Sequence, residues 1–472
     1  MRPQQVRNSR SGPHSGPIAP ARRAAFRALE AVRSRPIDLG EALRRYRDPL
    51  TDSRDRALAT DLVTGTLRWR GAIDFQIQRA ASKPLARLDP GVLDVLRLAV
   101  YQLLYLTRVP AAAIVGESVE LVRAAGFRSA GGFANAVLRK IAASRTAPVW
   151  PERPGPAVAS ADRQALVAYL AIVHSHPEWL VERWITRYGA EGAEVWLEFN
   201  NQRPAVTLAA NRLRIDRVEL GRRLLADGIE TQPTRVAPQG LTVTRGRVAG
   251  SAALREGLCL VQDEASQIVP ELVQAPARSR VLDACASPGG KTLALAAQAT
   301  DGLVVATDVR GRRIEILSET LRRTRAAHVR ILRVSEDGTL PFRAAVFDRV
   351  LVDAPCSGLG TVRRDPDIKW RRTPDDLAAF AAEQVRLLRR VAPLIAVGGR
   401  LIYSTCSSEP EENEEVVATF LREASNFVRL PLTHLAAVAA DIADMATSDG
   451  YLRTTPHDGL EAFFGAVLER RL

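Results

Sequence analysis

The chain has 472 residues, of which 46% are hydrophobic and 25% charged, and its net charge is +13. This length allows two or three domains with substantial cores, and no stretch comes near the roughly 18 uncharged apolar residues of a membrane helix, so an integral membrane protein and a membrane partner are not expected. The positive balance favours a polyanionic partner, most simply nucleic acid. Only four of the basic residues are lysines, however, and nearly all the others are arginines. A GC-rich genome encodes arginine-rich proteins without any functional demand, and this explains the positive charge equally well.

The four cysteines, Cys259, Cys285, Cys356 and Cys406, form no Cys-x-x-Cys pair. This spacing argues against a zinc site, and no metal is expected. A disulfide scaffold does not fit a long chain whose basic N-terminus lacks the apolar segment of a secretory signal. The cysteines are therefore reactive thiols or small buried side chains, and we expect a cytoplasmic protein.

The N-terminal third is predicted to be helical. Residues 1–17 are Pro, Gly, Ser and Arg with few apolar side chains, which is typical of a disordered basic tail that contacts nucleic acid. From 18 to 145, apolar residues recur at intervals of three and four, the pattern of an all-α bundle. Residues 146–161 are rich in proline and predict an interdomain linker.

The segment 162–275 mixes both kinds of pattern. Residues 176–189 predict an amphipathic helix, whereas 205–213 and 240–246 alternate in the manner of strands. Short strands combined with arginines suit a small α+β subdomain that faces RNA. A small α+β connector explains the same pattern equally well.

From 276 to 472, apolar strands alternate with amphipathic helices. This order predicts an α/β domain with a parallel sheet, and ligands are expected at the carboxyl ends of its strands. The predicted strands are 281–285, 302–308, 329–334, 347–354 and 399–405, with final strands in 426–432 and 461–470.

The first of these strands leads into a glycine turn. Arg280-Val281-Leu282 is followed by Asp283, then by Ser287-Pro288-Gly289-Gly290, and the next residues favour helix. Such a turn lets a ligand approach the backbone closely, and the helix N-terminus offers free N–H groups. The spacing differs from the G-x-G-x-x-G pattern, which disfavours a dinucleotide oxidoreductase.

Chemically active side chains follow the later strands. Asp308 closes the second strand, Asp337 follows the third, Asp353 the fourth and Cys406 the fifth. An acid at the end of the second strand typically binds ribose hydroxyls. Any one of the acids alone could be a helix cap, but together at one sheet edge they favour a cofactor that contains a nucleoside.

Cys356 and Cys406 follow neighbouring strands, so their thiols are expected to approach each other. Each lies in a turn of polar and small residues, Pro355-Cys356-Ser357-Gly358 and Thr405-Cys406-Ser407-Ser408. A thiolate near helix N-termini and arginines can have a pKa below its ordinary value of about 8.5. These settings favour reactive thiols over inert core cysteines.

Three motifs carry a family resemblance: Asp283-Ala-Cys-Ala-Ser-Pro-Gly-Gly-Lys291, Asp353-Ala-Pro-Cys-Ser-Gly358 and Ser404-Thr-Cys-Ser407. They resemble the signature of S-adenosylmethionine-dependent RNA cytosine-5 methyltransferases. Residues 363–372, RRDPDIKWRR, are similar to the bacterial 16S rRNA branch of that family, also called Sun or Fmu. The N-terminal helices resemble the NusB-like RNA-binding domain of this branch, so the resemblance covers nearly the whole chain from about residue 18.

The resemblance implies a fold and an activity. The fold is an all-α NusB-like domain plus a Rossmann-like class I methyltransferase domain. The expected reaction is methylation of C5 of one cytidine in 16S rRNA, unassembled or early in assembly, by a monomer. Cys406 is the implied nucleophile, Cys356 assists product release, and Asp353 contacts the cytosine ring. The residues implied to hold S-adenosylmethionine are Cys285, Ala286, Ser287, Pro288, Gly289, Gly290, Lys291, Asp308, Asp337 and Asp353. Ser287 departs from the pattern, because many members have Ala there.

Arg363, Arg364 and Lys369 follow the Cys356 turn and could bind substrate phosphates, although a solvated basic loop has the same composition. Three further readings of the chain stay open. One is transfer RNA as the substrate, and another is a non-catalytic RNA-binding assembly factor. The third is a DNA-type enzyme, in which the Pro-Cys residue Cys356 would be the nucleophile instead.

Overall fold

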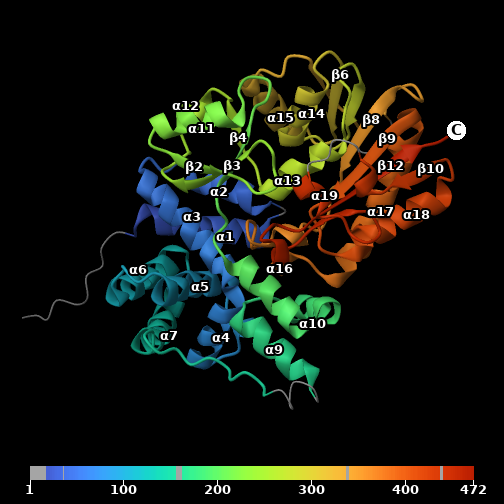
Figure 1. Cartoon of the computed structure of the whole chain (residues 1–472). Helices are drawn as coiled ribbons and strands as arrows, with labels where there is room; N and C mark the ends of the chain where they lie inside the picture. Colours follow the sequence, from blue (N-terminus) through green and yellow to red (C-terminus); the bar gives the residue numbers. More distant parts are fainter. Residues whose placement is uncertain (1–17, 36, 156–161, 336–339, 436–439) are drawn as a thin grey trace, which may run out of the picture. The chain divides into compact units, whose positions relative to one another are not determined.

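The computed structural model describes residues 18–35, 37–155, 162–335, 340–435 and 440–472. They form two compact units, one with the residues up to Asn201 together with Asp365–Arg371, the other with Gln202–Arg364 and Arg372–Leu472 (Figure 1). The predicted tail 1–17 and the predicted cofactor residue Asp337 lie outside the described residues.

The first unit is helical, as predicted. Asp38, Asp52 and Asp89 cap the N-termini of three helices, because each side chain accepts a hydrogen bond from a backbone N–H of the first turn. Its apolar side chains meet in one core, in which Leu62, Leu96 and others are fully buried. Its first seven α-helices are α1 Pro20–Ser34, α2 Leu39–Arg47, α3 Ser53–Arg68, α4 Arg70–Ala80, α5 Pro90–Tyr105, α6 Ala111–Ala124 and α7 Gly131–Ala143.

Three further helices belong to this helical unit: α9 Arg163–Val173, α10 Glu178–Asn201 and the short α16 Ile368–Arg371. The segment 162–275, expected as one subdomain, is thus divided at residue 201. The physical reason is packing: α10 buries Trp184 and Trp196, whose rings lie 5.2 Å apart, within the helical unit.

The second unit begins with a small antiparallel sheet whose strand order is β2-β3-β1-β4. The predicted strands in 205–213 and 240–246 are present as β1 and β3. Leu208, Leu220 and Leu241 contribute to its separate core. The elements are β1 Thr207–Ala210, α11 Arg217–Ala226, β2 Glu230–Pro233, β3 Gly240–Arg245, α12 Ala252–Arg255, β4 Cys259–Val261 and α13 Glu264–Ile268.

The main sheet of the second unit has the order β10-β12-β9-β8-β5-β6-β7, with β11 paired to β12. Strands β5 to β9 are parallel, as predicted, and β12 runs antiparallel to β9. The strands are β5 Arg280–Asp283, β6 Leu303–Asp308, β7 Val329–Arg333, β8 Phe347–Asp353, β9 Ile395–Thr405, β10 Phe427–Leu430, β11 Leu452–Thr454 and β12 Phe463–Arg470.

Helices cover both faces of this sheet (Figure 1). Val281 and Val304 face a core shared with α14 and α15, whereas Leu282 and Val305 face a core shared with α17 and α18. This alternation follows from the period of two along a strand. The helices are α14 Gly290–Gln298, α15 Gly311–Thr324, α17 Pro374–Val391, α18 Glu414–Glu423 and α19 Ala440–Ala443.

The strand order reverses next to β5, because β6 lies on one side of it and β8 on the other. Open α/β sheets bind ligands at the carboxyl ends of the strands at such a switch point. Asp283 ends β5 and Asp353 ends β8, so the fold places both at that edge. No helix among the described residues is long and apolar enough to cross a membrane.

Candidate functional site

The glycine turn (residues 285–290) connects β5 to α14. The Ser287–Pro288 peptide bond is cis, and Gly289 has φ = 107°, a conformation that L-residues with a Cβ rarely adopt. A Cβ at Gly289 would also lie 3.0 Å from Leu317 Cδ1. The turn therefore needs glycine at this position, and α14 begins at the next residue.

A cavity of about 570 Å³ lies beside this turn. Its volume is within the range of about 300–1,000 Å³ that is typical of small-molecule sites. Most of the predicted cofactor residues line it, although Gly289 and Asp308 do not. The lining residues are Leu254, Arg255, Leu260, Val261, Gln262, Ser266, Asp283, Cys285, Ala286, Ser287, Pro288, Gly290, Lys291, Thr320, Arg323 and Asp353.

Asp283 was not among the predicted site residues, yet its buried carboxylate lines the cavity. Thr292 Oγ1 donates a hydrogen bond of 2.7 Å to Oδ2, while Oδ1 has no hydrogen-bond partner among the described residues. Burial raises the pKa of Asp283 to about 7, against the opposing hydrogen bond from Thr292.

Lys291 and Asp353 form an ion pair at the cavity wall. Lys291 Nζ lies 2.8 Å from Asp353 Oδ2, and Ser404 Oγ donates to Asp353 Oδ1 at 2.8 Å. Burial lowers the pKa of Lys291, but the charge of Asp353 and its hydrogen bond outweigh that effect, and the net shift is upward. The lysine therefore remains a cation at the switch point.

Asp308 is buried at the end of β6, as its place in the sequence predicts, but its carboxylate is already engaged. Arg313 Nε lies 3.2 Å from Oδ2, and the backbone N–H of Arg310 donates to Oδ1 at 3.2 Å. Arg313 also donates to the carbonyl of Ser287 at 2.9 Å. Asp308 thus connects the glycine turn to the start of α15 through an arginine.

The two predicted catalytic thiols are brought together. Cys356 Sγ and Cys406 Sγ lie 3.4 Å apart, and both side chains are half-buried. The hydrogen bond with Cys406, followed by burial, holds the pKa of Cys356 well above its ordinary value. Cys285 lies in the glycine turn, where burial and the nearby acids Asp283 and Asp353 raise its pKa, and Cys259 is buried.

Sequence reasoning missed the buried carboxylate of Glu412, which joins the two cysteine loops, residues 354–358 and 404–408. Ser357 donates to it from its backbone N–H at 2.7 Å and from its hydroxyl at 2.5 Å, and the Ser407 hydroxyl donates to the same Oε2. Gln384 Nε2 donates to Oε1 at 3.1 Å. Burial raises the pKa of Glu412, although these hydrogen bonds oppose the rise.

Further buried polar groups extend this network. The Tyr403 hydroxyl donates to Gln384 Oε1 at 3.0 Å, and Gln384 Nε2 also donates to the carbonyl of Pro355 at 3.0 Å. On the other loop, Thr405 Oγ1 donates to Asn413 Oδ1, and Asn413 Nδ2 donates to the carbonyl of Ser407 at 3.0 Å. The only sequence signal for this network is the polar run SSEPEENE, which also fits an exposed acidic turn.

The three basic residues predicted to bind phosphate are all engaged elsewhere. Arg363 Nε pairs with Glu461 at 2.8 Å, and Arg364 Nε pairs with Asp263 at 3.0 Å. Lys369 is fully buried and donates to the carbonyl of Arg68 at 2.9 Å. The described structure therefore gives no support to phosphate binding by Lys369, because its ammonium group does not reach solvent.

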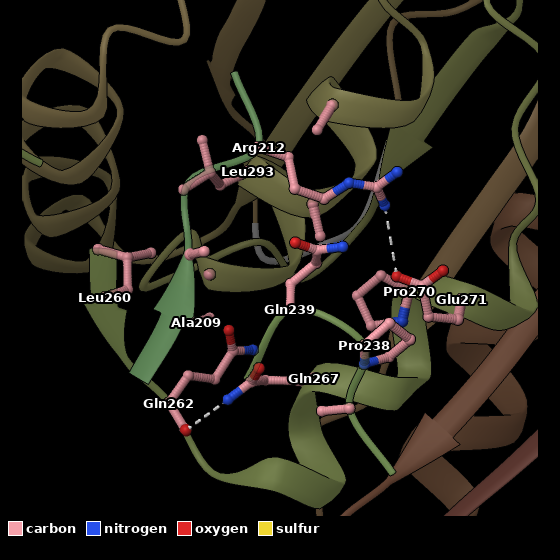
Figure 2. A pocket seen from close by; sticks show the side chains of 15 residues that line it. Ala209, Arg212, Pro238, Gln239, Leu260, Gln262, Gln267, Pro270, Glu271 and Leu293 are labelled. Carbon is pink, nitrogen blue, oxygen red and sulfur yellow. Dashed lines mark hydrogen bonds and ion pairs between the residues drawn. The ribbon is translucent and has the colours of Figure 1, made fainter. Parts of the chain in front are cut away.

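A smaller hollow of about 30 Å³ lies between the small sheet and α14 (Figure 2). Arg212 and Glu271 face each other across it at 3.6 Å, and Gln262 and Gln267 line its other side. A space of this size admits one or two water molecules. It is too small for a cofactor, whereas the cavity beside the glycine turn is within the size range of small-molecule sites.

Among the described residues, one group has the spacing of metal ligands: His174, Glu194 and Glu198, with donor atoms within 4.8 Å of one another. Arg153 makes two hydrogen bonds of 2.8 Å to Glu194. Because that arginine already neutralises the glutamate and occupies both of its oxygens, the group is better described as an ion-pair cluster than as a metal centre.

Comparison with known proteins gives three matching family models. The model of 16S rRNA methyltransferase RsmB/F matches residues 272–469, the NusB family matches 19–143, and a ferredoxin-like domain of RsmF/B-like methyltransferases matches 176–249.

The similar proteins and the similar solved structure described next are also named as methyltransferases or as a methyltransferase homologue. A probable ribosomal RNA small subunit methyltransferase B of Bacillus subtilis is 35% identical over 89% of this chain and 91% of its own length. The ribosomal RNA small subunit methyltransferase B of Pseudomonas putida is 36% identical over 85% of this chain and 88% of its own. The crystal structure of a methyltransferase homologue from Pyrococcus horikoshii is 27% identical, with a TM-score of 0.55 over 68% of this chain and 100% of its own.

Proposed function

Because the chain belongs to the ribosomal RNA small subunit methyltransferase B family, we propose that it methylates C5 of one cytidine in 16S rRNA through a covalent cysteine adduct. One observation carries this proposal. The thiols of Cys356 and Cys406 lie 3.4 Å apart, beyond the strands that also position Asp353 and the cavity-lining glycine turn. A pair of thiols at this edge suits a reaction in which one attacks the base and the other assists release.

The proposed cofactor is S-adenosylmethionine, which supplies an electrophilic methyl group when bound. The cavity of about 570 Å³ has room for it, and the buried Oδ1 of Asp283, which lacks a partner among the described residues, offers an acceptor for a polar group. The residues proposed to hold it are the turn Cys285 to Lys291, with Asp308, Asp337 and Asp353. Asp308 would act at the end of β6, where acids typically bind ribose hydroxyls.

Covalent attack explains how a cytosine becomes reactive. Cytosine C5 is a weak nucleophile, and addition of a thiolate at C6 converts the C5 position into an enamine-like carbon. Cys406 is the proposed nucleophile. The 3.4 Å separation supports a shared role for the two thiols, since one thiol can donate to the sulfur of the other.

Charge develops on the ring during the addition. Asp353 is proposed to contact the base near N3, with Lys291 and Ser404 holding its carboxylate in place. After methylation the C5 proton must leave and the C6–S bond must break, so that the electrons of the C5–H bond re-form the C5–C6 double bond and Cys406 departs as a thiolate. Cys356 is proposed to assist removal of that proton, directly or through water.

The substrate must expose its target base, because a thiol cannot reach C6 within a stacked helix. Unassembled 16S rRNA, or rRNA early in assembly, meets this condition. The NusB-like domain supports an RNA partner, and the proposed setting is the cytoplasm, with the protein acting as a monomer.

The test is transfer of a tritiated methyl group from S-adenosylmethionine to unmodified 16S rRNA by wild type, Cys406→Ala and Cys356→Ala. Wild type should produce 5-methylcytidine. Cys406→Ala should produce none, because the nucleophile is lost. Cys356→Ala should accumulate a protein–RNA adduct that survives denaturation, because release is impaired.

Three results would contradict parts of the proposal. An adduct that forms in Cys406→Ala and not in Cys356→Ala would exchange the roles of the thiols. Labelling of transfer RNA in place of rRNA would keep the chemistry and remove the substrate assignment. A wild-type protein that binds RNA without binding S-adenosylmethionine would be a non-catalytic assembly factor.

A further inference from the structure

A second cavity, of about 230 Å³, lies within the helical unit. Its walls come from α1, α3, α4 and α5 and from the segment 367–371, which lies far away in sequence but belongs to the same unit. The lining residues are Leu29, Val32, Arg33, Thr66, Leu67, Arg70, Asp94, Arg97, Asp367, Trp370 and Arg371.

Two buried polar atoms of this cavity have no hydrogen-bond partner among the described residues: Thr66 Oγ1 and Asp367 Oδ1. Their residues are 1% and 2% exposed. Arg371 NH1 occupies the other oxygen of Asp367 at 3.2 Å. Since nearly all buried polar groups in proteins are satisfied, these two atoms call for polar partners, which a molecule in the cavity lined by both residues would supply.

Most arginines around the cavity are already paired. Arg33 Nε lies 2.7 Å from Asp94 Oδ2, and Arg97 makes two hydrogen bonds of 2.7 Å to Asp74. Arg70 differs, because its closest ion-pair contact is Asp74 at 3.8 Å. Burial, followed by repulsion from Arg97, lowers the pKa of Arg70 to about 10.

An aromatic ring completes the wall. Trp370 donates from its indole N–H to the carbonyl of Leu67 at 2.6 Å, which fixes the ring. The guanidinium carbon of Arg70 lies 5.2 Å from the ring centroid. Together with Leu29 and Val32, these groups make a surface that suits a flat, weakly polar molecule.

The charges and the volume of this cavity favour one class of ligand over others. A free anion is disfavoured, because three of the four arginines in the wall already pair with carboxylates: Arg33 with Asp94, Arg97 with Asp74 and Arg371 with Asp367. A volume of about 230 Å³ is below the roughly 300–1,000 Å³ of sites that enclose whole small molecules, so one ring system fits better than a complete nucleotide. A nucleobase combines a flat face, N–H donors for a carboxylate and acceptors for a hydroxyl or guanidinium.

We infer that this cavity binds one unpaired nucleobase of the RNA substrate, an inference that rests on the proposed function. Asp367 Oδ1 accepts an N–H of the base, while Thr66 Oγ1 and Arg70 bond to its acceptor atoms. Arg33 and Arg371, whose side chains are about one-third exposed, lie at the rim and face the sugar-phosphate chain. The helical unit would thereby hold a single-stranded part of the rRNA.

The decisive variant is Thr66→Val, which removes the hydroxyl and keeps the shape. Because that hydroxyl has no partner among the described residues, the full chain should fold with unchanged or higher thermal stability. Its affinity for unmodified 16S rRNA in a filter-binding assay should fall about three- to tenfold, the effect of one lost hydrogen bond. Asp367→Asn should weaken binding further, because it removes the charged acceptor.

The matched control is Thr64→Val in the same helix. Thr64 Oγ1 donates to the carbonyl of Thr60 at 2.8 Å and does not line the cavity, so its RNA affinity should equal that of wild type. Ultraviolet cross-linking of the wild-type complex, followed by mass spectrometry, should place a nucleotide on the peptide that contains Trp370.

Equal affinities of Thr66→Val and Thr64→Val would overturn the inference, and so would cross-links that avoid the peptides lining the cavity. Failure of the proposed function is separable, since it appears as an absence of methyl transfer by the wild-type protein. A wild type that methylates rRNA while Thr66→Val binds like Thr64→Val would leave the proposed function intact and remove only the base-binding cavity.

Discussion

The cysteine loops and the glycine turn lie at one edge of the same sheet but hold their buried carboxylates differently. Both oxygens of Glu412 accept hydrogen bonds, from Ser357, Ser407 and Gln384. Asp283 accepts one from Thr292, while its Oδ1 has no partner among the described residues. A fully satisfied buried network makes a part of the protein rigid, whereas a buried polar atom without a partner is costly. The cysteine loops are therefore held by a complete hydrogen-bond network, whereas the glycine turn lies beside a buried oxygen that has no partner among the described residues.

Among the variants that test this difference between the two regions, Glu412→Gln is expected to have the largest effect on methyl transfer. The amide would remove the negative charge and place an NH2 group opposite the Ser357 and Ser407 hydroxyls, so charge-assisted hydrogen bonds worth about 1.5–3 kcal/mol each would become weaker neutral ones and the cysteine loops would be held less firmly. We expect about 100-fold slower methyl transfer at saturating substrates, as misplaced reacting groups produce, and lower thermal stability. The assays are single-turnover methyl transfer and calorimetry.

The control for that change is Glu415→Gln, which removes the same charge from an exposed residue three positions later. It should behave like wild type. If Glu412→Gln transferred methyl groups at the wild-type rate, the cysteine loops would not depend on the Glu412 carboxylate for their arrangement.

A tenfold effect is expected on the cofactor side from Gly289→Ala. The residue would have to keep φ = 107° and place a Cβ 3.0 Å from Leu317, at a cost of about 1–2 kcal/mol in backbone strain alone. The turn should shift, and the KM for S-adenosylmethionine should rise roughly tenfold with a smaller change in kcat. Steady-state kinetics measure both.

Gly459→Ala is the matched strain control. Gly459 has φ = 73°, a Cβ added there would meet no atom within 4 Å, and the residue lies outside the glycine turn. The variant should lose a similar stability and keep its KM. A KM that rose equally in both variants would show that strain alone, and not the shape of the turn, limits cofactor binding.

The smallest effect is expected from Asp283→Asn, on the pH dependence of the free energy of unfolding. Burial raises the pKa of Asp283 to about 7, above the value of about 3.9 for an exposed Asp, so the folded state holds a proton that the unfolded state releases. The stability from this group is complete below about pH 4 and is lost as the pH rises through about 7. Asp283→Asn should make the fall in unfolding free energy between these pH values shallower by up to about 1.4 kcal/mol per pH unit.

Denaturant titrations at a series of pH values measure that slope. Glu461 provides an internal reference, since burial raises its pKa to about 7 as well, and its contribution should persist in Asp283→Asn. An unchanged slope would mean that Asp283 is ionised in the folded protein.

The sequence predicted the catalytic half of the fold because parallel strands bring their carboxyl ends to one edge. Asp353, Cys356 and Cys406 could be grouped on this basis alone, and the structure places the two thiols 3.4 Å apart. Glu412 could not be predicted, because its run of acids is typical of an exposed turn. Only the tertiary fold places Ser357 and Ser407 around it.

The segment 363–372 is a second place where the sequence alone gives the wrong expectation of exposure. Its charges predict an exposed basic loop, since lysine and arginine are seldom buried. Lys369 is nevertheless enclosed, with the carbonyl of Arg68 at the end of α3 as its hydrogen-bond partner, and burial, followed by the charge of Arg68, holds its pKa well below the ordinary value. A partner three hundred residues away in sequence leaves no local signal.

That long-range contact also sets an order of events during synthesis. Lys369 and Trp370 donate to the carbonyls of Arg68 and Leu67, which precede them by 301 and 303 residues. Ribosomes add about 5–20 residues per second, so the first helices emerge about 15–60 s before the segment that covers the end of α3. The helical unit begins to fold early, yet its last segment, Asp365–Arg371, is translated only when about half of the segment 272–469 that matches the methyltransferase model has been made.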